Sequence, residues 1–303
     1  MTGQQRSEVA EVQPRLEGTT RLRGNLLIGA LVLSVVLAFG YLLIVLTPFG
    51  HGFDNEAYLG RDLDGRTVVH VEGDFLNHIT IAVVALGLLG LIVIGASRRA
   101  PLVGLIAAGG VGTAVAGAEI LKRVLPWQHL VDTDYLLSPG LQRETYPSGH
   151  ATIGTSFVLA LLMLMPHGWR WWASVIGGLV AVSFGLGVVI AGWHRPSDAI
   201  GGACWSGVVM ALATWLAIRL QGRRSSDGTN GAAARIQVRR SVMMSAGLGL
   251  AVYVGVIAVA LLDHPSLPDA DIAFIVYALV ITVGALWVPS WYGNLLGPVE
   301  WHE

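Results

Sequence analysis

The sequence has little charge and almost no cysteine. Only 13% of its 303 residues are charged and 53% are hydrophobic, and the mean hydropathy is +0.62. A soluble domain of this length needs more polar surface than this composition supplies. The single cysteine, Cys204, excludes an internal disulfide and a metal site built from several cysteines. What remains is the class of integral membrane proteins.

Long stretches with almost no charge predict transmembrane helices. A helix needs about 20 apolar residues to cross the hydrocarbon layer. We therefore expect an all-α fold, a polytopic membrane helix bundle with eight spans. The first apolar run is too long for a signal-peptide core, so we interpret it as a retained span. The predicted spans are 25–46, 76–96, 101–121, 149–165, 171–193, 197–220, 242–262 and 272–289.

A polar stretch near residue 230 divides the chain. Residues 221–240 are rich in Gly, Ser, Ala and Arg, which is typical of a flexible linker. We therefore expect a tail over 1–24, a six-span core over 25–220, the linker, and a two-span appendix over 241–303. The region from 221 to 303 is a candidate for docking a protein partner. We expect the lipid bilayer as the surroundings and no nucleic-acid partner.

The basic residues predict the orientation in the membrane. Most of the 19 Lys and Arg residues fall on the side that carries the N-terminus, and the opposite loop 48–75 is acidic. Cytoplasmic loops carry the excess of Lys and Arg. We therefore expect a multi-pass protein of the cell membrane with both termini cytoplasmic.

Three polar sets fall at the predicted outer ends of the spans. Lys122 ends the third span, the Pro-Ser-Gly-His segment 147–150 leads into the fourth, and segment 194–198 joins the fifth to the sixth. Two helix N-termini thus open toward the same aqueous boundary. Free N–H groups and the positive end of the helix dipole suit a phosphate there.

His194 and Asp198 are four residues apart, so in a helical turn they share one face. The carboxylate then accepts a hydrogen bond from the imidazole and makes it more nucleophilic. His150, on the neighbouring helix, is placed to give a proton to a leaving oxygen. Lys122 would add a point charge for the phosphoryl oxygens. This arrangement needs neither a metal ion nor another cofactor.

Each of these features has a simpler interpretation when it is taken alone. Ser148 and Gly149 would serve as a turn and helix cap. Lys122 and Arg123 would extend toward the headgroups from a helix end. Glu119, one turn earlier, would be the ion-pair partner of Lys122. Their convergence at adjacent helix ends is what favours a functional site.

The two outer segments together carry a known pattern. Segment 147–150, followed by His194-x-x-x-Asp198, resembles the second and third signature motifs of the type-2 phosphatidic acid phosphatase family, the lipid phosphate phosphatases. Lys122 stands where the first motif of that family begins. The resemblance covers roughly residues 76–220, and the six-span arrangement extends it to about residue 25.

The resemblance implies a role for each matching residue. His194 is the expected nucleophile, which forms a phospho-histidine intermediate, and Asp198 orients it. His150 is the expected acid for the leaving group. Lys122 and the backbone of 148–149 are expected to bind the phosphoryl group.

The chain departs from the family pattern at two positions. The first motif, KxxxxxxRP, ends here in His129 and Leu130. Gly187 and Val188 occupy the Ser-Arg positions of the third motif, SRxxxxxHxxxD. The chain therefore resembles a divergent member that lacks both usual arginines. The candidate substitutes for these cations are Arg195, Arg143, Arg123 and His129.

The expected function is a metal-independent phosphatase that acts on a polyprenyl or glycerophospholipid phosphate or diphosphate at the extracytoplasmic face. One variant is a phosphoryl transferase, in which another acceptor replaces water. Another alternative is a catalytically weakened relative that binds lipid phosphates or assists assembly. A transporter fits less well, because the polar residues gather on one side instead of at the midplane. Loop 48–75 either caps the site or contacts a partner.

Overall fold

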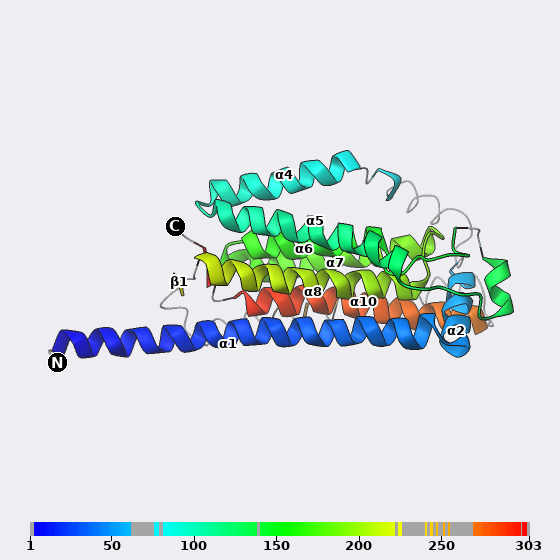
Figure 1. The fold of residues 1–303 in the computed structure, drawn as a ribbon, viewed down its shortest axis with the longest axis horizontal. Helices are drawn as coiled ribbons and strands as arrows, with labels where there is room; N and C mark the ends of the chain where they lie inside the picture. The colour runs from blue at the N-terminus through cyan, green and yellow to red at the C-terminus, as the bar shows by residue number, and fades with distance from the viewer. Residues whose placement is uncertain are drawn as a thin grey trace.

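The computed structural model describes residues 3–61, 76–78, 81–137, 140–221, 224–225, 269–297 and 299–301, with isolated positions between 240 and 254. These residues form an elongated helical bundle, with both described ends of the chain at one end of it and α2 at the other (Figure 1). The helices are α1 (Gly3–Gly40) with its π-helical end η1 (Tyr41–Val45), α2 (Pro48–Leu59), α4 (Ile81–Ser97), α5 (Pro101–Val124), η2 (Asp132–Leu136), α6 (Gly149–Leu164), η3 (His167–Trp169), α7 (Arg170–Ile190), α8 (Pro196–Gln221) and α10 (Asp269–Leu295). Apart from a two-residue antiparallel ladder between β1 (Arg224–Ser225) and β2 (Val299–Glu300), the described elements are helical.

Five of the described helices are long and apolar enough to cross a membrane. The five segments are Thr19–Val45, Pro101–Val124, His167–Ile190, Pro196–Gln221 and Asp269–Leu295. The shorter apolar helices α4 and α6 lie where the second and fourth spans were predicted. The predicted span 242–262 lies outside the described residues except for isolated positions. The prediction of a multi-pass helical membrane protein is confirmed, and the count of eight spans stays a prediction.

The last helix is longer than the sequence suggested. The predicted span 272–289 ends at a proline, but α10 continues through Pro289 to Leu295. Proline removes one helical hydrogen bond and usually ends a helix in water. Neighbouring helices support such a position in a membrane bundle. Here α10 packs against α7, α8, α6 and α2, so the helix does not end at Pro289.

Small residues set how closely α7 and α10 approach. A Cβ atom added at Gly178 would lie 2.9 Å from the side chain of Leu286, and one at Gly185 would lie 2.9 Å from that of Ile281. Without side chains at these glycines, the two helices pack at close range over several turns. Therefore α10 lies directly on the helices of the predicted six-span core.

A short helix at the end of the bundle opposite the N-terminus was not predicted. Within loop 48–75, α2 begins at Pro48, and the side chain of Thr47 caps it by accepting a hydrogen bond from the N–H of Gly50 at 3.1 Å. Proline suits the first turn of a helix, where its missing N–H costs nothing. This helix packs against α10, α8 and η2. It therefore covers part of the end of the bundle that carries the candidate site.

Candidate active site

The turn between α7 and α8 places His194. Gly192 has a φ of +73°, in the left-handed region that glycine adopts without strain. The N–H groups of Trp193 and His194 both donate to the carbonyl of Val188, at 3.0 and 3.1 Å. The hydroxyl of Tyr58 donates to the carbonyl of Gly192 at 3.1 Å. The turn therefore holds the backbone of His194 from two sides.

Asp198 orients the imidazole of His194. The His194 Nδ1 atom lies 3.1 Å from Asp198 Oδ2, which also accepts the N–H of Arg195 at 3.0 Å. Asp198 is buried, and the side chain of His194 keeps 11% of its exposure. Because the carboxylate accepts at Nδ1, the proton belongs there and Nε2 keeps its lone pair. The predicted four-residue pair thus has the geometry of an oriented nucleophile.

The N-terminus of α6 is joined directly to that of α8. The Ser148 N–H donates to the carbonyl of Asp198 at 2.8 Å, and the Ser148 side chain caps α6 by accepting from the N–H of Ala151 at 3.4 Å. A Cβ at Gly202 would lie 2.7 Å from the carbonyl oxygen of Ser148. This close approach brings two positive helix ends together, as the sequence suggested.

Lys122 and Glu119 reach this junction from α5. Their side chains form an ion pair, with Nζ and Oε1 2.5 Å apart. A Cβ at Gly149 would lie 2.9 Å from Glu119 Oε1 and 3.5 Å from Lys122 Nζ. Glycine at position 149 therefore leaves room for this pair beside the first turn of α6. Lys122 is therefore paired with Glu119 and also borders the site, and its role in binding a phosphoryl group stays a prediction.

A cavity of about 380 Å³ lies between the end of α5 and the turn that joins α7 to α8. Its walls include Lys122, Arg143, Thr145, Trp193 and His194. The ring of His150 packs against that of Trp193, with 5.2 Å between their centroids. Two cations and the candidate nucleophile thus share one cavity, and the candidate acid lies against its wall.

The other three candidate cations lie elsewhere. The Arg195 side chain is buried and donates to Asn55 Oδ1 at 2.8 Å, and its guanidinium lies 3.7 Å from Asp134 Oδ1. His129 is exposed, with Nδ1 3.9 Å from the Asp134 carboxylate. Arg123 is exposed on α5, and neither it nor His129 lines the cavity. Of the four proposed substitutes, only Arg143 lies in the cavity with His194.

The residues that hold Arg195 come from α2 and η2, which sequence reasoning missed. Asn55 donates to Asp134 Oδ1 at 2.8 Å, and His51 Nε2 lies 2.7 Å from the same oxygen. Burial raises the pKa of Asp134, but hydrogen bonds from Asn55 and from the Leu130 N–H outweigh it and leave the pKa below its usual value. The carboxylate therefore stays charged and can hold Arg195.

Asp54 links α2 to the start of α8. It accepts the Ser197 N–H at 3.0 Å and the Ser197 hydroxyl at 2.6 Å. Burial, and then the charge of Asp198, raise the pKa of Asp54 to about 7. A sequence pattern could have indicated this helix. Four polar residues have a spacing that places their side chains on one helical face, namely His51, Asp54, Asn55 and Tyr58.

No metal centre emerges from these contacts. Within the part of the chain that the structure describes, no three His, Cys, Asp or Glu side chains lie close enough together to hold an ion. The residues gathered at the site supply two imidazoles, cations and helix N-termini.

Comparison with known proteins covers the same part of the chain. Residues 99–223 match the PAP2 superfamily, a stretch that contains Lys122, His150, His194 and Asp198. A protein named undecaprenyl-diphosphatase from Sulfolobus acidocaldarius is 34% identical over 83 residues, which are 27% of this chain and 38% of that protein. No solved structure matches the chain. The resemblance to the type-2 phosphatidic acid phosphatases is thereby confirmed.

Proposed function

We propose that the chain is a membrane phosphatase of the PAP2 superfamily, whose family model its residues 99–223 match, and that it hydrolyses a lipid phosphate or diphosphate through a phospho-histidine intermediate. The observation that carries this proposal is the His194–Asp198 pair, 3.1 Å apart, beside a cavity that also contains Lys122 and Arg143. A polyprenyl diphosphate is the favoured class, because the similar archaeal protein is named for one. Water is the proposed acceptor in the second step.

In the first step, the lone pair on His194 Nε2 attacks phosphorus and the bond from phosphorus to the leaving oxygen breaks. His150 gives its proton to that oxygen, and Asp198 stabilises the positive imidazole through Nδ1–H. In the second step, water attacks the phospho-histidine, its proton goes to His150, and the phosphorus–nitrogen bond breaks. Lys122 and Arg143 stabilise the charge on the phosphoryl oxygens throughout.

The proposed location is the extracytoplasmic face of the cell membrane. The cavity is formed by the end of α5 and the turn that joins α7 to α8. In Figure 1 this end of the bundle, beside α2, lies opposite the N-terminus. The distribution of basic residues supports a cytoplasmic N-terminus. A lipid with its chain in the bilayer and its headgroup in water reaches such a site without a channel.

Phosphate release from a panel of lipid phosphates by purified protein in detergent tests the activity. We expect turnover by the wild type and none by His194→Ala. Brief mixing with a radiolabelled substrate should label the wild type with an acid-labile phosphoryl group. Equal release by the two proteins on every substrate would refute the enzyme hypothesis.

A catalytically weakened relative that binds lipid phosphates is the second candidate. The observation that favours it is the absence of arginine at position 188, together with the burial of Arg195 in contacts with Asn55 and Asp134. This candidate predicts that a lipid phosphate binds to the wild type and that no phosphate is released. A phosphoryl transferase would instead release phosphate only onto an added lipid or sugar acceptor.

A further inference from the structure

Helix α2 has a polar face and an aromatic face, and the polar face is the buried one. His51, Asp54 and Asn55 are at most 1% exposed, whereas Phe49 is 87% and Phe53 is 39% exposed. Phe49 and Phe53 are four residues apart, so their rings share one side of the helix. An amphipathic helix on a protein in water shows the reverse arrangement, with its apolar face on the core.

The polar face of α2 binds the turn that carries His194, on both sides of that residue. Three side chains of this face make hydrogen bonds of 2.6–3.1 Å to residues that flank His194. The bonds join Tyr58 to Gly192, Asn55 to Arg195, and Asp54 to Ser197. The place of α2 therefore fixes the backbone before and after the candidate nucleophile.

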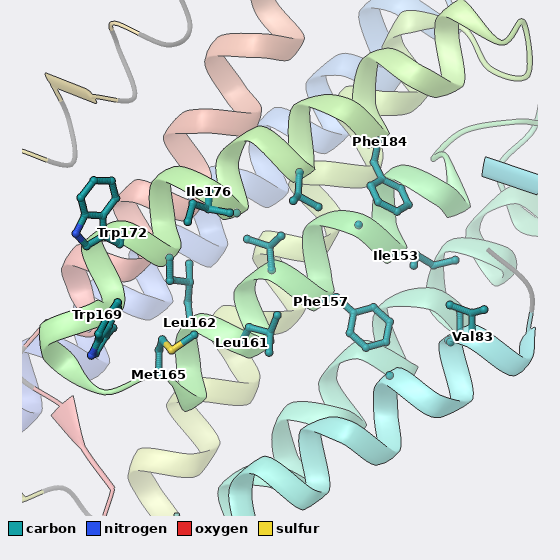
Figure 2. A pocket seen from close by; sticks show the side chains of 17 residues that line it. Val83, Ile153, Phe157, Leu161, Leu162, Met165, Trp169, Trp172, Ile176 and Phe184 are labelled. Atoms are coloured by element: carbon teal, nitrogen blue, oxygen red, sulfur yellow. The ribbon is translucent and has the colours of Figure 1, made fainter. Parts of the chain in front are cut away.

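Elsewhere on the bundle, exposed apolar side chains mark surface that faces lipid. One such surface is an apolar groove of about 590 Å³ between α4, α6 and α7, where every lining residue is a hydrophobic side chain or a glycine. Figure 2 shows this wall, in which Ile176 is 59% exposed. An exposed apolar surface of this kind is typical of contact with a membrane. Phe49 is more exposed than Ile176, and it lies on a helix whose polar residues all turn inward.

The aromatic face of α2 lies between two apolar stripes on neighbouring spans. The first candidate span ends at Val45, and α2 begins at Pro48 and packs against α10, the last candidate span. Each of the two spans presents three exposed apolar side chains near this end of the bundle. They are Phe39, Leu42 and Leu43 on the first span, and Ile272, Val276 and Val280 on the last. The aromatic face thus continues the surface that these spans present to lipid.

The depth of Phe53 agrees with a place in the membrane surface. Its ring centroid lies 5.5 Å from that of Tyr277 on α10. Tyr277 follows Asp271, the last charged residue of α10, by six residues, which at about 1.5 Å per residue is about 9 Å. A helix that lies in the membrane surface buries its apolar face by about 5–10 Å. In Figure 1, α2 lies across the end of the bundle instead of continuing the line of α1.

From these observations we propose that the aromatic face of α2 lies in the lipid layer at the end of the bundle that carries the candidate site. This contact with lipid holds the polar face of α2 against the turn that carries His194. The partner is a lipid surface, bound through Phe49 and Phe53. The contact itself is independent of the proposed function, whereas its effect on turnover rests on that function. Anchoring of α2 in the membrane is then a condition for full activity.

Spin labels test the contact with lipid. They are attached to Phe49→Cys and Phe53→Cys in the full chain carrying Cys204→Ala, because Cys204 is the only natural cysteine. The protein is placed in nanodiscs of phosphatidylcholine and phosphatidylglycerol. Relaxation of each label by oxygen, which concentrates in hydrocarbon, is compared with relaxation by a water-soluble nickel chelate. We expect both labels to favour oxygen, as a label at Phe39→Cys should, whereas one at Asp132→Cys, an exposed position of η2, should favour nickel.

Two results of the labelling would overturn the inference. Labels at positions 49 and 53 that favour nickel would place the aromatic face in water. Labels that are reached by neither reagent would show that another segment of the chain, or a second copy of it, covers this face.

The double variant Phe49→Ser/Phe53→Ser tests the coupling to His194. Phe39→Ser is the matched control, because Phe39 is also an exposed phenylalanine but lies on α1. In nanodiscs we expect faster hydrogen exchange over residues 192–198 in the double variant, with unchanged exchange in α5. We also expect kcat for phosphate release from undecaprenyl diphosphate to fall roughly tenfold, since a misplacement of about 1 Å can cost about 10²-fold. The control should match the wild type, and wild-type exchange in the double variant overturns the coupling.

The measurements separate this inference from the proposed function. Labels in lipid and faster exchange over residues 192–198, together with no phosphate release from any substrate, would remove the enzyme and keep the membrane contact of α2. Phosphate release by the wild type, together with labels in water or with an unchanged kcat in the double variant, would keep the enzyme and remove the inference.

Discussion

His194 and Arg195 are adjacent in the chain, yet their side chains lie in two different regions. His194 borders an open cavity together with Lys122 and Arg143. Arg195 is 3% exposed and lies among Asn55, Asp134 and Thr145. In the first region the cations of Lys122 and Arg143 face the cavity. In the second region the guanidinium of Arg195 is held by other side chains of the protein. The comparison teaches that a place next to His194 in the chain does not bring the side chain of Arg195 into the cavity that is proposed to hold the phosphate.

The largest loss of activity should come from replacing Asp198. Its carboxylate contacts the imidazole of His194 and also accepts the backbone N–H of Arg195. Asp198→Asn leaves a side chain of the same shape but cannot stabilise a positive imidazole, and it favours the wrong tautomer of His194. We expect kcat to fall by roughly 10²–10⁴, measured as phosphate release, with expression intact. Asp132→Asn, at an exposed position in η2, is the control. Full activity in Asp198→Asn would show that the assignment of His194 and Asp198 as a catalytic pair is wrong.

Replacing Arg143 and Arg195 one at a time should give the next largest effects, on activity for Arg143 and on stability for Arg195. Arg143 is exposed at the cavity, so Arg143→Ala should lower kcat/KM by roughly 10²-fold, as the loss of one transition-state donor does, without changing the midpoint of thermal unfolding. Arg195→Ala removes one partner of a buried ion pair and should cost about 3–5 kcal/mol of stability. Phosphate release and thermal unfolding in detergent measure both variants.

Two further variants serve as controls for this contrast. Arg123 and His129 are exposed and do not line the cavity, so Arg123→Ala and His129→Ala should retain the wild-type kcat/KM and midpoint. If Arg195→Ala were stable and had a weakened KM, Arg195 would join the phosphate site. If Arg143→Ala kept its activity, Lys122 and the helix N-termini would be the remaining phosphate ligands.

The sequence could predict the first region better than the second. The contact between His194 and Asp198 follows from a four-residue spacing, and the Ser148 cap follows from its place before an apolar run. These are local relations. Membrane spans are also local, because composition alone identifies them.

The second region depends on contacts between distant parts of the chain. Asn55 and Asp134 are 79 residues apart, and Asn55 and Arg195 are 140 apart. No spacing rule joins such residues, so the sequence could place Arg195 near the site only through its position next to His194. The groove between α4, α6 and α7 is of the same kind, because it exists only after three helices pack.

The smallest predicted effect is a change of thermal stability with pH, which depends on Asp54 in α2. The pKa of Asp54 is raised to about 7, first by burial and then by the charge of Asp198. A raised pKa in the folded state means that folding favours the protonated carboxyl. The contribution of Asp54 to the free energy of unfolding is fully present below about pH 4 and is lost as the pH rises through about 7.

Asp54→Asn should remove this dependence, because an amide does not titrate. Between pH 5 and 8 we expect the midpoint of thermal unfolding to fall by several degrees more in the wild type than in Asp54→Asn, since about 1 kcal/mol corresponds to roughly 2–4 °C in a protein of this size range. Glu56→Gln, two residues along α2, is the control and should follow the wild type. Parallel curves for Asp54→Asn and the wild type would show that Asp54 is ionised throughout, and that its two bonds to Ser197 outweigh the burial of its charge.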